Sequence, residues 1–247
     1  MKTKNPFAFA FVITLMTALC LSGCSNNSTA PELQEFKDFK AKADQGDAEA
    51  QYTVGSCYSE GYGVPRDYQE AVKWFRMAAD QEHADAQHNL GVCYERGEGV
   101  PRDYQEALKW YHMAADKGNA YAQSAVGRCY YNGTGVPQDY QEAMKWFHMA
   151  ADQGHVDAQY NLGVCYYKGE GVSRDSQEAM KWFHMAADQG DAYAQYYLGI
   201  CYHDGEGVSQ DYQEAVKWMQ KAADQRHDEA RLLLHQWRVF SEIKTKQ

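Results

Sequence analysis

The sequence predicts an all-α solenoid, in which helix pairs stack in a row and each pair buries its apolar face against the next. Two observations support this prediction. A nine-residue string, AVKWFRMAA over residues 71–79, returns in nearly the same form four more times. Its tryptophan recurs every 36 residues, at Trp74, Trp110, Trp146, Trp182 and Trp218. A fixed period of this length indicates an array of similar units rather than one globular core.

The start of the chain reads as the export signal of a lipoprotein. Lys2 and Lys4 precede an apolar run over residues 7–19, which is too short to span a bilayer as a helix. The LSGC that follows resembles the bacterial lipobox, in which the cysteine is lipidated and becomes the new N-terminus; here that cysteine is Cys24. We therefore expect a signal peptide over residues 1–23. An ordinary signal peptide cleaved elsewhere is the alternative, but no A-x-A site stands out.

A lipid on this cysteine would tie the chain to the cell envelope. Residues 24–31 are mostly small and polar, as in a short flexible tether. The lipobox resemblance further implies an outer-membrane location in a host with two membranes, because Ser25 rather than an aspartate follows the cysteine. We therefore expect a bacterial envelope protein that is held to the membrane by its lipid and faces the periplasm.

Five full units follow, over residues 46–81, 82–117, 118–153, 154–189 and 190–225. In the first unit, apolar residues at helical spacing predict helix A over residues 47–60. Gly61 and Gly63 then interrupt the helical pattern. Asp67 and Glu70 have the offset of a capping box, in which the aspartate accepts an amide of the first turn and the glutamate reaches back. Helix B is therefore expected to begin at Asp67.

The turn after helix B has one of two sequence types. Gly118, Gly154 and Gly190 supply a residue that readily adopts the left-handed conformation. Glu82 and Arg226 stand at the equivalent position in the other turns. We expect those two turns to close differently.

Incomplete units at both ends predict capping helices. Residues 32–45 align with the second half of a unit, but Asp38 replaces the tryptophan. A polar residue there suits a helix with one face that has no neighbour. Residues 226–247 repeat only the first helix of a unit, which predicts a C-terminal capping helix and a charged tail.

The repeated pattern resembles the sel-1-like repeat, a relative of the tetratricopeptide repeat with a longer loop between its helices. Most residues that carry the resemblance recur in all units, and in the first unit they are Ala50, Gln51, Gly55, Tyr58, Gly61, Gly63, Val64, Asp67, Ala71, Trp74, Ala78 and Ala79. The resemblance implies a right-handed superhelix that serves as an adaptor surface.

Comparison of the five units separates recurring positions of helix A from varying ones. Recurring positions fall on one side of the helix and indicate packing, whereas the opposite side changes from unit to unit. In stacked pairs of this type the A helices line the concave surface, so the varying side is expected to form a groove. Tyrosine is a favoured interface anchor. The expected partner, a protein or peptide, would contact Tyr52, His88, Tyr160, Tyr193, Tyr196 and Tyr197.

Two alternatives to this groove remain open at this point. The tyrosines could be ordinary helix-surface residues, since single exposed aromatic side chains are common. The convex face could instead bind the partner through the outward residues of helix B, such as Arg76, His112 and His148.

One cysteine recurs in helix A of every unit, at Cys57, Cys93, Cys129, Cys165 and Cys201. Equivalent positions of stacked helices lie about 8–10 Å apart. That separation is too large for a disulfide or for shared metal ligation. We therefore expect five free, buried thiols and no metal site. By the same argument His112, His148 and His184 lie too far apart to share a metal ion, and we expect them to point to solvent. Nothing in the sequence indicates a cofactor.

Charge and missing motifs bear on function. The formal net charge of −10 argues against a nucleic-acid partner. Some cysteine-rich relatives of the sel-1-like family bind or hydrolyse penicillins, so a β-lactam or peptidoglycan-fragment binder with weak β-lactamase activity is the alternative function. Ser241 and Lys244 satisfy S-x-x-K, but the S-D-N and K-T-G elements are absent. We therefore expect a scaffold without catalytic residues rather than an enzyme.

Overall fold

The computed structural model describes residues 30–244, and every regular element within them is an α-helix. The elements are α2 (Ala30–Ala43), α3 (Ala48–Glu60), α4 (Tyr68–Asp80), α5 (Ala84–Arg96), α6 (Tyr104–Ala115), α7 (Ala120–Asn132), α8 (Tyr140–Ala151), α9 (Val156–Lys168), α10 (Ser176–Asp188), α11 (Ala192–Asp204), α12 (Tyr212–Asp224) and α13 (Asp228–Lys244). The signal peptide expected over residues 1–23, the lipidation site Cys24 and most of the 24–31 tether lie outside the described residues.

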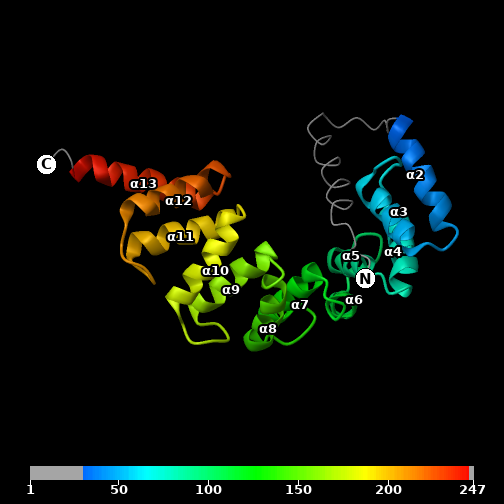
Figure 1. Cartoon of the computed structure of the whole chain (residues 1–247), viewed down its shortest axis with the longest axis horizontal. Helices are drawn as coiled ribbons and strands as arrows, with labels where there is room; N and C mark the ends of the chain where they lie inside the picture. Colours follow the sequence, from blue (N-terminus) through cyan, green and yellow to red (C-terminus); the bar gives the residue numbers. More distant parts are fainter. Residues whose placement is uncertain (1–29, 245–247) are drawn as a thin grey trace, which may run out of the picture.

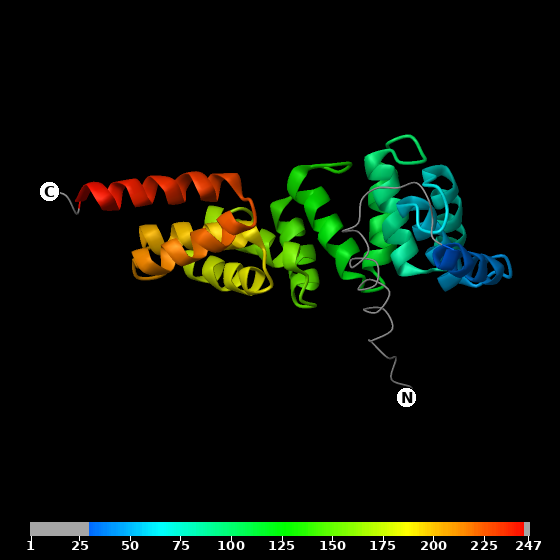
Figure 2. The ribbon, with the colours of Figure 1, turned by 90° about the horizontal axis from the view of Figure 1, so that it is seen from above.

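The helices form consecutive pairs, from α3–α4 to α11–α12, and α2 and α13 close the two ends. Figure 1 shows the pairs following one another along a curved path, and Figure 2 shows α2 and α13 at opposite ends of the row. Buried apolar residues gather in successive clusters between neighbouring helices instead of one central core. The structure therefore confirms the predicted all-α solenoid. The first capping helix begins at Ala30, slightly before the predicted boundary.

Local hydrogen bonds explain where each helix begins. Before α3, the Asp47 side chain accepts the Ala50 amide at 2.7 Å. Before α4, the Asp67 side chain accepts the amides of the first turn, including that of Glu70 at 3.0 Å. Only this half of the expected capping box forms, because the Glu70 carboxylate pairs with Lys73 instead of reaching back.

The turns between pairs all close in one way, which corrects an expectation. Gly118 takes the left-handed conformation, with φ +85°, and its amide donates to the Ala115 carbonyl at 2.9 Å. Glu82 adopts the same conformation, with φ +66°, and donates to Ala79 at 2.9 Å. Arg226 behaves likewise. The expectation that these turns differ is wrong, because stacking of the next pair requires this geometry whatever the residue.

The most deeply buried large side chain of each pair lies directly after the recurring tryptophan. Phe147 is 1% exposed and packs against Gly127 of the preceding helix, where a Cβ atom would lie 2.6 Å from its ring. The tryptophans themselves are less uniform. Trp74, Trp110 and Trp218 are buried, whereas Trp146 and Trp182 are half-buried. The equivalent residues that share the site of Phe147 are Phe75, Tyr111, Phe183 and Met219.

The helix B histidines lie between units, so the expectation that they point to solvent is wrong. His112 packs edge-on against Trp146, with ring centroids 5.2 Å apart. His148 and His184 make the same contact with the tryptophan of the next unit, at 5.5 Å. Burial lowers the pKa of His112 and of His184.

A column of buried glutamines joins each pair to the turn that follows it. Gln123 donates to the Ala115 carbonyl at 3.2 Å and accepts from Gln153 at 2.7 Å. The same two bonds form at Gln51, Gln159 and Gln195. At Gln87 only the first bond forms, because Lys117 replaces the second glutamine. The Gln87 side-chain oxygen is consequently buried without a hydrogen-bond partner.

The five recurring cysteines are free and buried, as expected. Burial raises the pKa of Cys57, Cys93, Cys165 and Cys201 to about 12, and that of Cys129 to about 11. Since the thiolate is the reactive and metal-binding form, these thiols are inert core side chains.

Candidate binding groove

A groove of about 800 Å³ runs across the first helices of four successive pairs. Its walls include His88 on α5, Tyr121 on α7, Tyr160 on α9 and Tyr193 on α11. These residues come from the varying side of helix A, whose recurring side is buried in the stack. We call this surface the A-face groove.

Three of the six residues predicted to bind a partner line the A-face groove. His88 lies against the rings of Tyr111 and Tyr121, and burial lowers its pKa. Tyr160 packs between Phe183 and Tyr193, with ring centroids 6.3 and 5.8 Å away, and burial raises its pKa. Tyr193 is 57% exposed.

The other three predicted residues take part in packing between units and do not line the groove. Tyr52 stacks on His83 with ring centroids 4.9 Å apart. Tyr197 stacks on the buried ring of Phe183 at 5.0 Å. Tyr196 stacks on His227 at 4.7 Å. Sequence periodicity places all three on the varying side, but it does not show that rings of a neighbouring unit cover them.

Sequence reasoning missed the most exposed aromatic residue of the groove. Tyr121 is 65% exposed and lies in the first turn of α7. The predicted residue Tyr193 occupies the equivalent position two units later, so a comparison of this position across units could have identified Tyr121 as well.

Two columns of equivalent residues run along the groove edge. The cap column consists of the residues that precede the first helix of each unit, namely Asp47, His83, Asn119, His155, Asp191 and His227. The edge column consists of the residues two positions later, namely Glu49, Asp85, Tyr121, Asp157, Tyr193 and Glu229. Each cap residue accepts a backbone amide of its own helix; His155, for example, accepts that of Ala158 through Nδ1.

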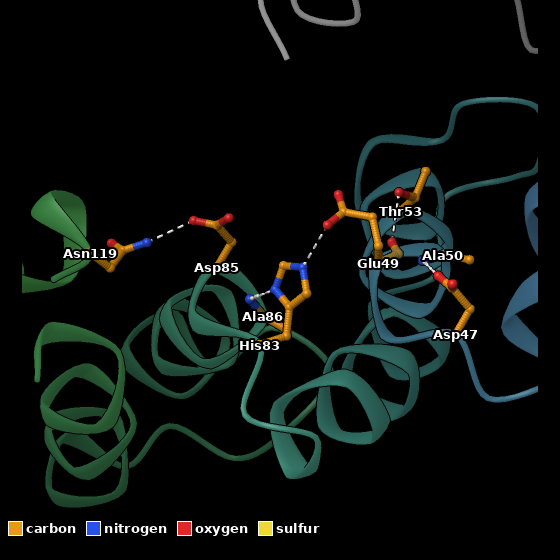
Figure 3. A network of polar contacts seen from close by, with 8 residues as sticks. All are labelled: Asp47, Glu49, Ala50, Thr53, His83, Asp85, Ala86 and Asn119. Atoms are coloured by element: carbon orange, nitrogen blue, oxygen red, sulfur yellow. Dashed lines mark hydrogen bonds and ion pairs between the residues drawn. The ribbon is translucent and has the colours of Figure 1, made fainter. Parts of the chain in front are cut away.

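Four of the cap residues also contact the edge residue of the preceding unit. Figure 3 shows His83 beside Glu49, with 3.2 Å between Nε2 and the carboxylate, and Asn119 donating to Asp85 at 2.7 Å. Further along, His155 packs on the ring of Tyr121 and His227 on that of Tyr193, with centroids 4.8 and 4.7 Å apart. The carboxylates at the first two junctions are thus paired, and the tyrosines meet their histidines edge to face.

The contacts between the cap and edge columns form a ladder of junctions, and one junction differs from the rest. Where the others oppose unlike or neutral groups, the cap residue that follows Asp157 in the next unit is a second carboxylate, Asp191, and both line the groove. The pKa of Asp191 is raised, first by burial and also by the charge of Asp157. Among the described residues, Asp157 has no hydrogen bond or ion pair from its side chain. This negative site lies between Tyr121 and Tyr193 along the edge column.

The opposite end of the groove is basic. Its basic excess is small, because Arg96, Arg102 and Arg128 line it together with Glu95 and Glu98, and Arg128 binds the Glu95 carboxylate at 2.8 Å. Arg102 also lies over the ring of Tyr104, 5.5 Å from its centroid. The A-face groove therefore runs from a cationic end near α5 and α7 to an anionic end near α9 and α11.

Chemistry other than binding has little support in the described part of the chain. Residues 30–244 contain no group of three or more histidine, cysteine or acidic side chains that could hold a metal ion. No helix in that range has the length and apolar character needed to cross a bilayer. Ser241 and Lys244 lie near the end of α13, where side chains are not described.

The helical array matches a known repeat model in five consecutive blocks, over residues 48–83, 84–119, 120–155, 156–191 and 192–227. The chain belongs to the Sel1 repeat family. Its blocks have the predicted period and start two residues after the predicted units. Sel1 repeat proteins are generally non-enzymatic scaffolds that mediate protein–protein interactions.

Solved Sel1 structures resemble this chain closely. It is 38% identical to c5321, a protective antigen of uropathogenic Escherichia coli with a TM-score of 0.78, over 84% of this chain and 45% of c5321. A Sel1 repeat protein from Oxalobacter formigenes is 32% identical, with a TM-score of 0.75 and coverage of 83% and 87%.

Among curated proteins, DAP3-binding cell death enhancer 1 of Rattus norvegicus is 40% identical over 62 residues, which are 25% of this chain and 12% of that protein. The chain thus spans only a small part of this relative and less than half of c5321.

Proposed function

We propose that this Sel1 repeat scaffold binds an extended segment of a partner protein in the A-face groove. The observation that carries the proposal is a hollow across four equivalent helices in which Tyr121 and Tyr193 stay 65% and 57% exposed. A large aromatic side chain exposed in a groove loses contact with water when a partner covers it. A few such residues usually dominate the binding free energy of an interface.

Photo-crosslinking in cells that express the full chain tests this proposal. A photoreactive phenylalanine is placed at Asn161, which lines the groove, or at Met149, which is 40% exposed on α8 outside it. We expect protein adducts from Asn161 and few from Met149. Adducts from Met149 alone would mean that the convex face binds the partner.

We further propose that the scaffold is held in the bacterial cell envelope by a lipid on Cys24, facing the periplasm from the outer membrane. The basic start, the apolar run and LSGC support this location. The bacterial origin of c5321 and of the Oxalobacter protein agrees with it.

Metabolic labelling with a fatty-acid analogue tests the anchor. Label should be incorporated into the wild-type chain and into Cys20→Ala, the matched control, because bulky Leu19 precedes Cys20 and disfavours lipidation there. Cys24→Ala should carry no label. Equal labelling of the two variants would refute lipidation at Cys24.

A further inference from the structure

The junction between Asp157 and Asp191 departs from the pattern of the ladder. At the two preceding acidic positions of the edge column, the next cap residue offers the carboxylate a hydrogen-bonding partner: His83 Nε2 lies 3.2 Å from Glu49, and Asn119 donates to Asp85 at 2.7 Å. At Asp157 the next cap residue adds a second negative charge. The same arrangement therefore gives the acidic residue a hydrogen-bonding partner at two junctions and a second acidic residue at the third.

The helix dipole accounts for only part of this arrangement. A carboxylate in the first turn of a helix is stabilised by the exposed amides there, which suits Asp157 on α9 as it suits Asp85 on α5. It does not explain why the residue opposite is also acidic, since asparagine caps α7 equally well at Asn119. Asp191 is half-buried and Asp157 is exposed beside it, and two like charges so placed repel each other unless a cation lies between them.

The surroundings of the acidic pair suit an organic cation better than a metal ion. Tyr121 and Tyr193 occupy the edge positions on either side of Asp157 and are largely exposed. Aromatic faces beside carboxylates are the environment in which guanidinium and ammonium groups bind, through cation–π contact and ion pairing. The described residues offer no third histidine, cysteine or acidic ligand for a metal here.

An unpaired donor lies at the same end of the groove. His227 is 9% exposed, its Nδ1 accepts the Ala230 amide and lies 3.3 Å from the Glu229 carboxylate, and its Nε2 has no hydrogen-bond partner. The corresponding nitrogen of His83 reaches Glu49, so the Nε2 of His227 faces the position of Tyr193. A buried N–H without an acceptor is costly. A peptide carbonyl that follows the basic side chain would supply the acceptor once the Tyr193 ring shifts.

We infer that the Asp157–Asp191 pair is the specificity subsite of the A-face groove and takes a basic side chain, arginine or lysine, from the bound peptide. This inference rests on the proposed function and names the chemistry of its partner. The cation neutralises both carboxylates, and Tyr121 and Tyr193 flank it. The basic end of the groove, around Arg96 and Arg102, gives the peptide a direction, because it favours acidic side chains there.

A randomised hexapeptide library tests the subsite. The peptides are acetylated and amidated so that their ends carry no charge, and they are selected on the full chain held in detergent micelles with a chelator present. Wild type should enrich peptides with arginine or lysine at one position. A fluorescent copy of the most enriched peptide should bind Asp157→Asn and Asp191→Asn about tenfold more weakly, a loss of about 1.4 kcal/mol.

Asp85→Asn and Glu49→Gln are matched controls, because each removes one negative charge from the same column at a junction that is already paired. Both should bind the peptide as wild type does. Equal weakening by the controls would show attraction to overall negative charge and would overturn the inference. Enrichment of peptides without a basic position would overturn it while sparing the proposed function. Retention of no peptide at all would overturn both.

Discussion

The buried glutamine column and the cap and edge columns repeat with the same period but differ in what recurs. In the glutamine column, four units make the same pair of hydrogen bonds. In the cap and edge columns, almost every junction has its own chemistry, from His83 with Glu49 to Asp157 with Asp191. A position that lies between helices meets the same surroundings in every unit, so one residue suits all. A position on the groove edge has no such constraint.

The exposed methionines of helix B are an exception to this contrast. Met77, Met113, Met149 and Met185 recur although each is about two-fifths exposed, at 38%, 43%, 40% and 45%. Recurrence therefore indicates packing only where burial accompanies it. These methionines lie on the surface that serves as the control for the A-face groove in a binding experiment.

The largest expected effect comes from truncating the buried ring of one unit. Phe147→Ala should lower the free energy of unfolding by about 3–5 kcal/mol, because Phe147 is 1% exposed and fills the space above Gly127. Trp146→Ala should cost less, about 1–2 kcal/mol, since Trp146 is only half-buried. Urea unfolding followed by circular dichroism gives both values. A greater loss of unfolding free energy for Trp146→Ala would mean that Trp146, and not Phe147, is the main core residue of this unit.

Restoring the missing bond of the glutamine column should stabilise the chain. In Lys117→Gln the new side chain can donate to the buried oxygen of Gln87, a gain of about 1–2 kcal/mol. The exposed contact of Lys117 with Glu82, at 3.6 Å, contributes little to stability. Lys109→Gln, on the outside of α6, is the control and should change the free energy of unfolding by less than about 0.5 kcal/mol. If Lys117→Gln does not raise the free energy of unfolding by more than the control does, the unpaired Gln87 oxygen does not lower the stability of the chain.

Replacing Glu82, which has the left-handed backbone conformation, offers a smaller gain in stability. Glu82→Gly should stabilise the chain by about 0.5–1 kcal/mol, because glycine adopts φ +66° without strain. Gly118→Ala at the equivalent turn should destabilise it by a similar amount, since nothing lies within 4 Å of the added Cβ and only the backbone conformation opposes it. The two melting temperatures must move in opposite directions if the turns are equivalent.

The smallest effect is a pH dependence of the cap column. His155 caps α9 through an unprotonated Nδ1, and burial lowers its pKa. The unfolded chain therefore binds the proton more tightly, so this contribution to stability is present above pH about 6.5 and is lost as the pH falls below it. His155→Asn keeps a cap of the kind seen at Asn119 and should reduce the loss between pH about 7.5 and 5 by up to about 1 kcal/mol. His235→Asn, at an exposed site on α13, should not.

Features set by local chemistry could be predicted from the sequence. The period, the helix starts at Asp67 and its equivalents, and the buried, unpaired cysteines follow from residue spacing and the distance between stacked helices. Features that depend on contact between units could not. Tyr197 looks like a surface residue until Phe183 is seen beneath it, and His112 looks solvated until Trp146 is placed beside it.

The same limit on prediction from the sequence applies to the groove. Its position on helix A could be predicted, because the varying side of that helix faces away from the stack. Which of its tyrosines remain exposed depends on what the next unit places beside them. His155 meets only one edge of Tyr121, whereas the rings of Tyr52 and Tyr196 are stacked face to face on a histidine.

The yield of adducts from the photoreactive residue at Asn161 tests the central claim most directly, measured in wild type, in Tyr121→Ala with Tyr193→Ala, and in Met113→Ala with Met149→Ala. Binding in the A-face groove predicts at least a tenfold lower yield, or about 1.4 kcal/mol, for the tyrosine pair, with its melting temperature nearly unchanged because both rings are largely exposed. The methionine pair should leave the yield at the wild-type level. A yield that survives loss of both tyrosines and falls with the methionines would place the binding surface on helix B and contradict this account.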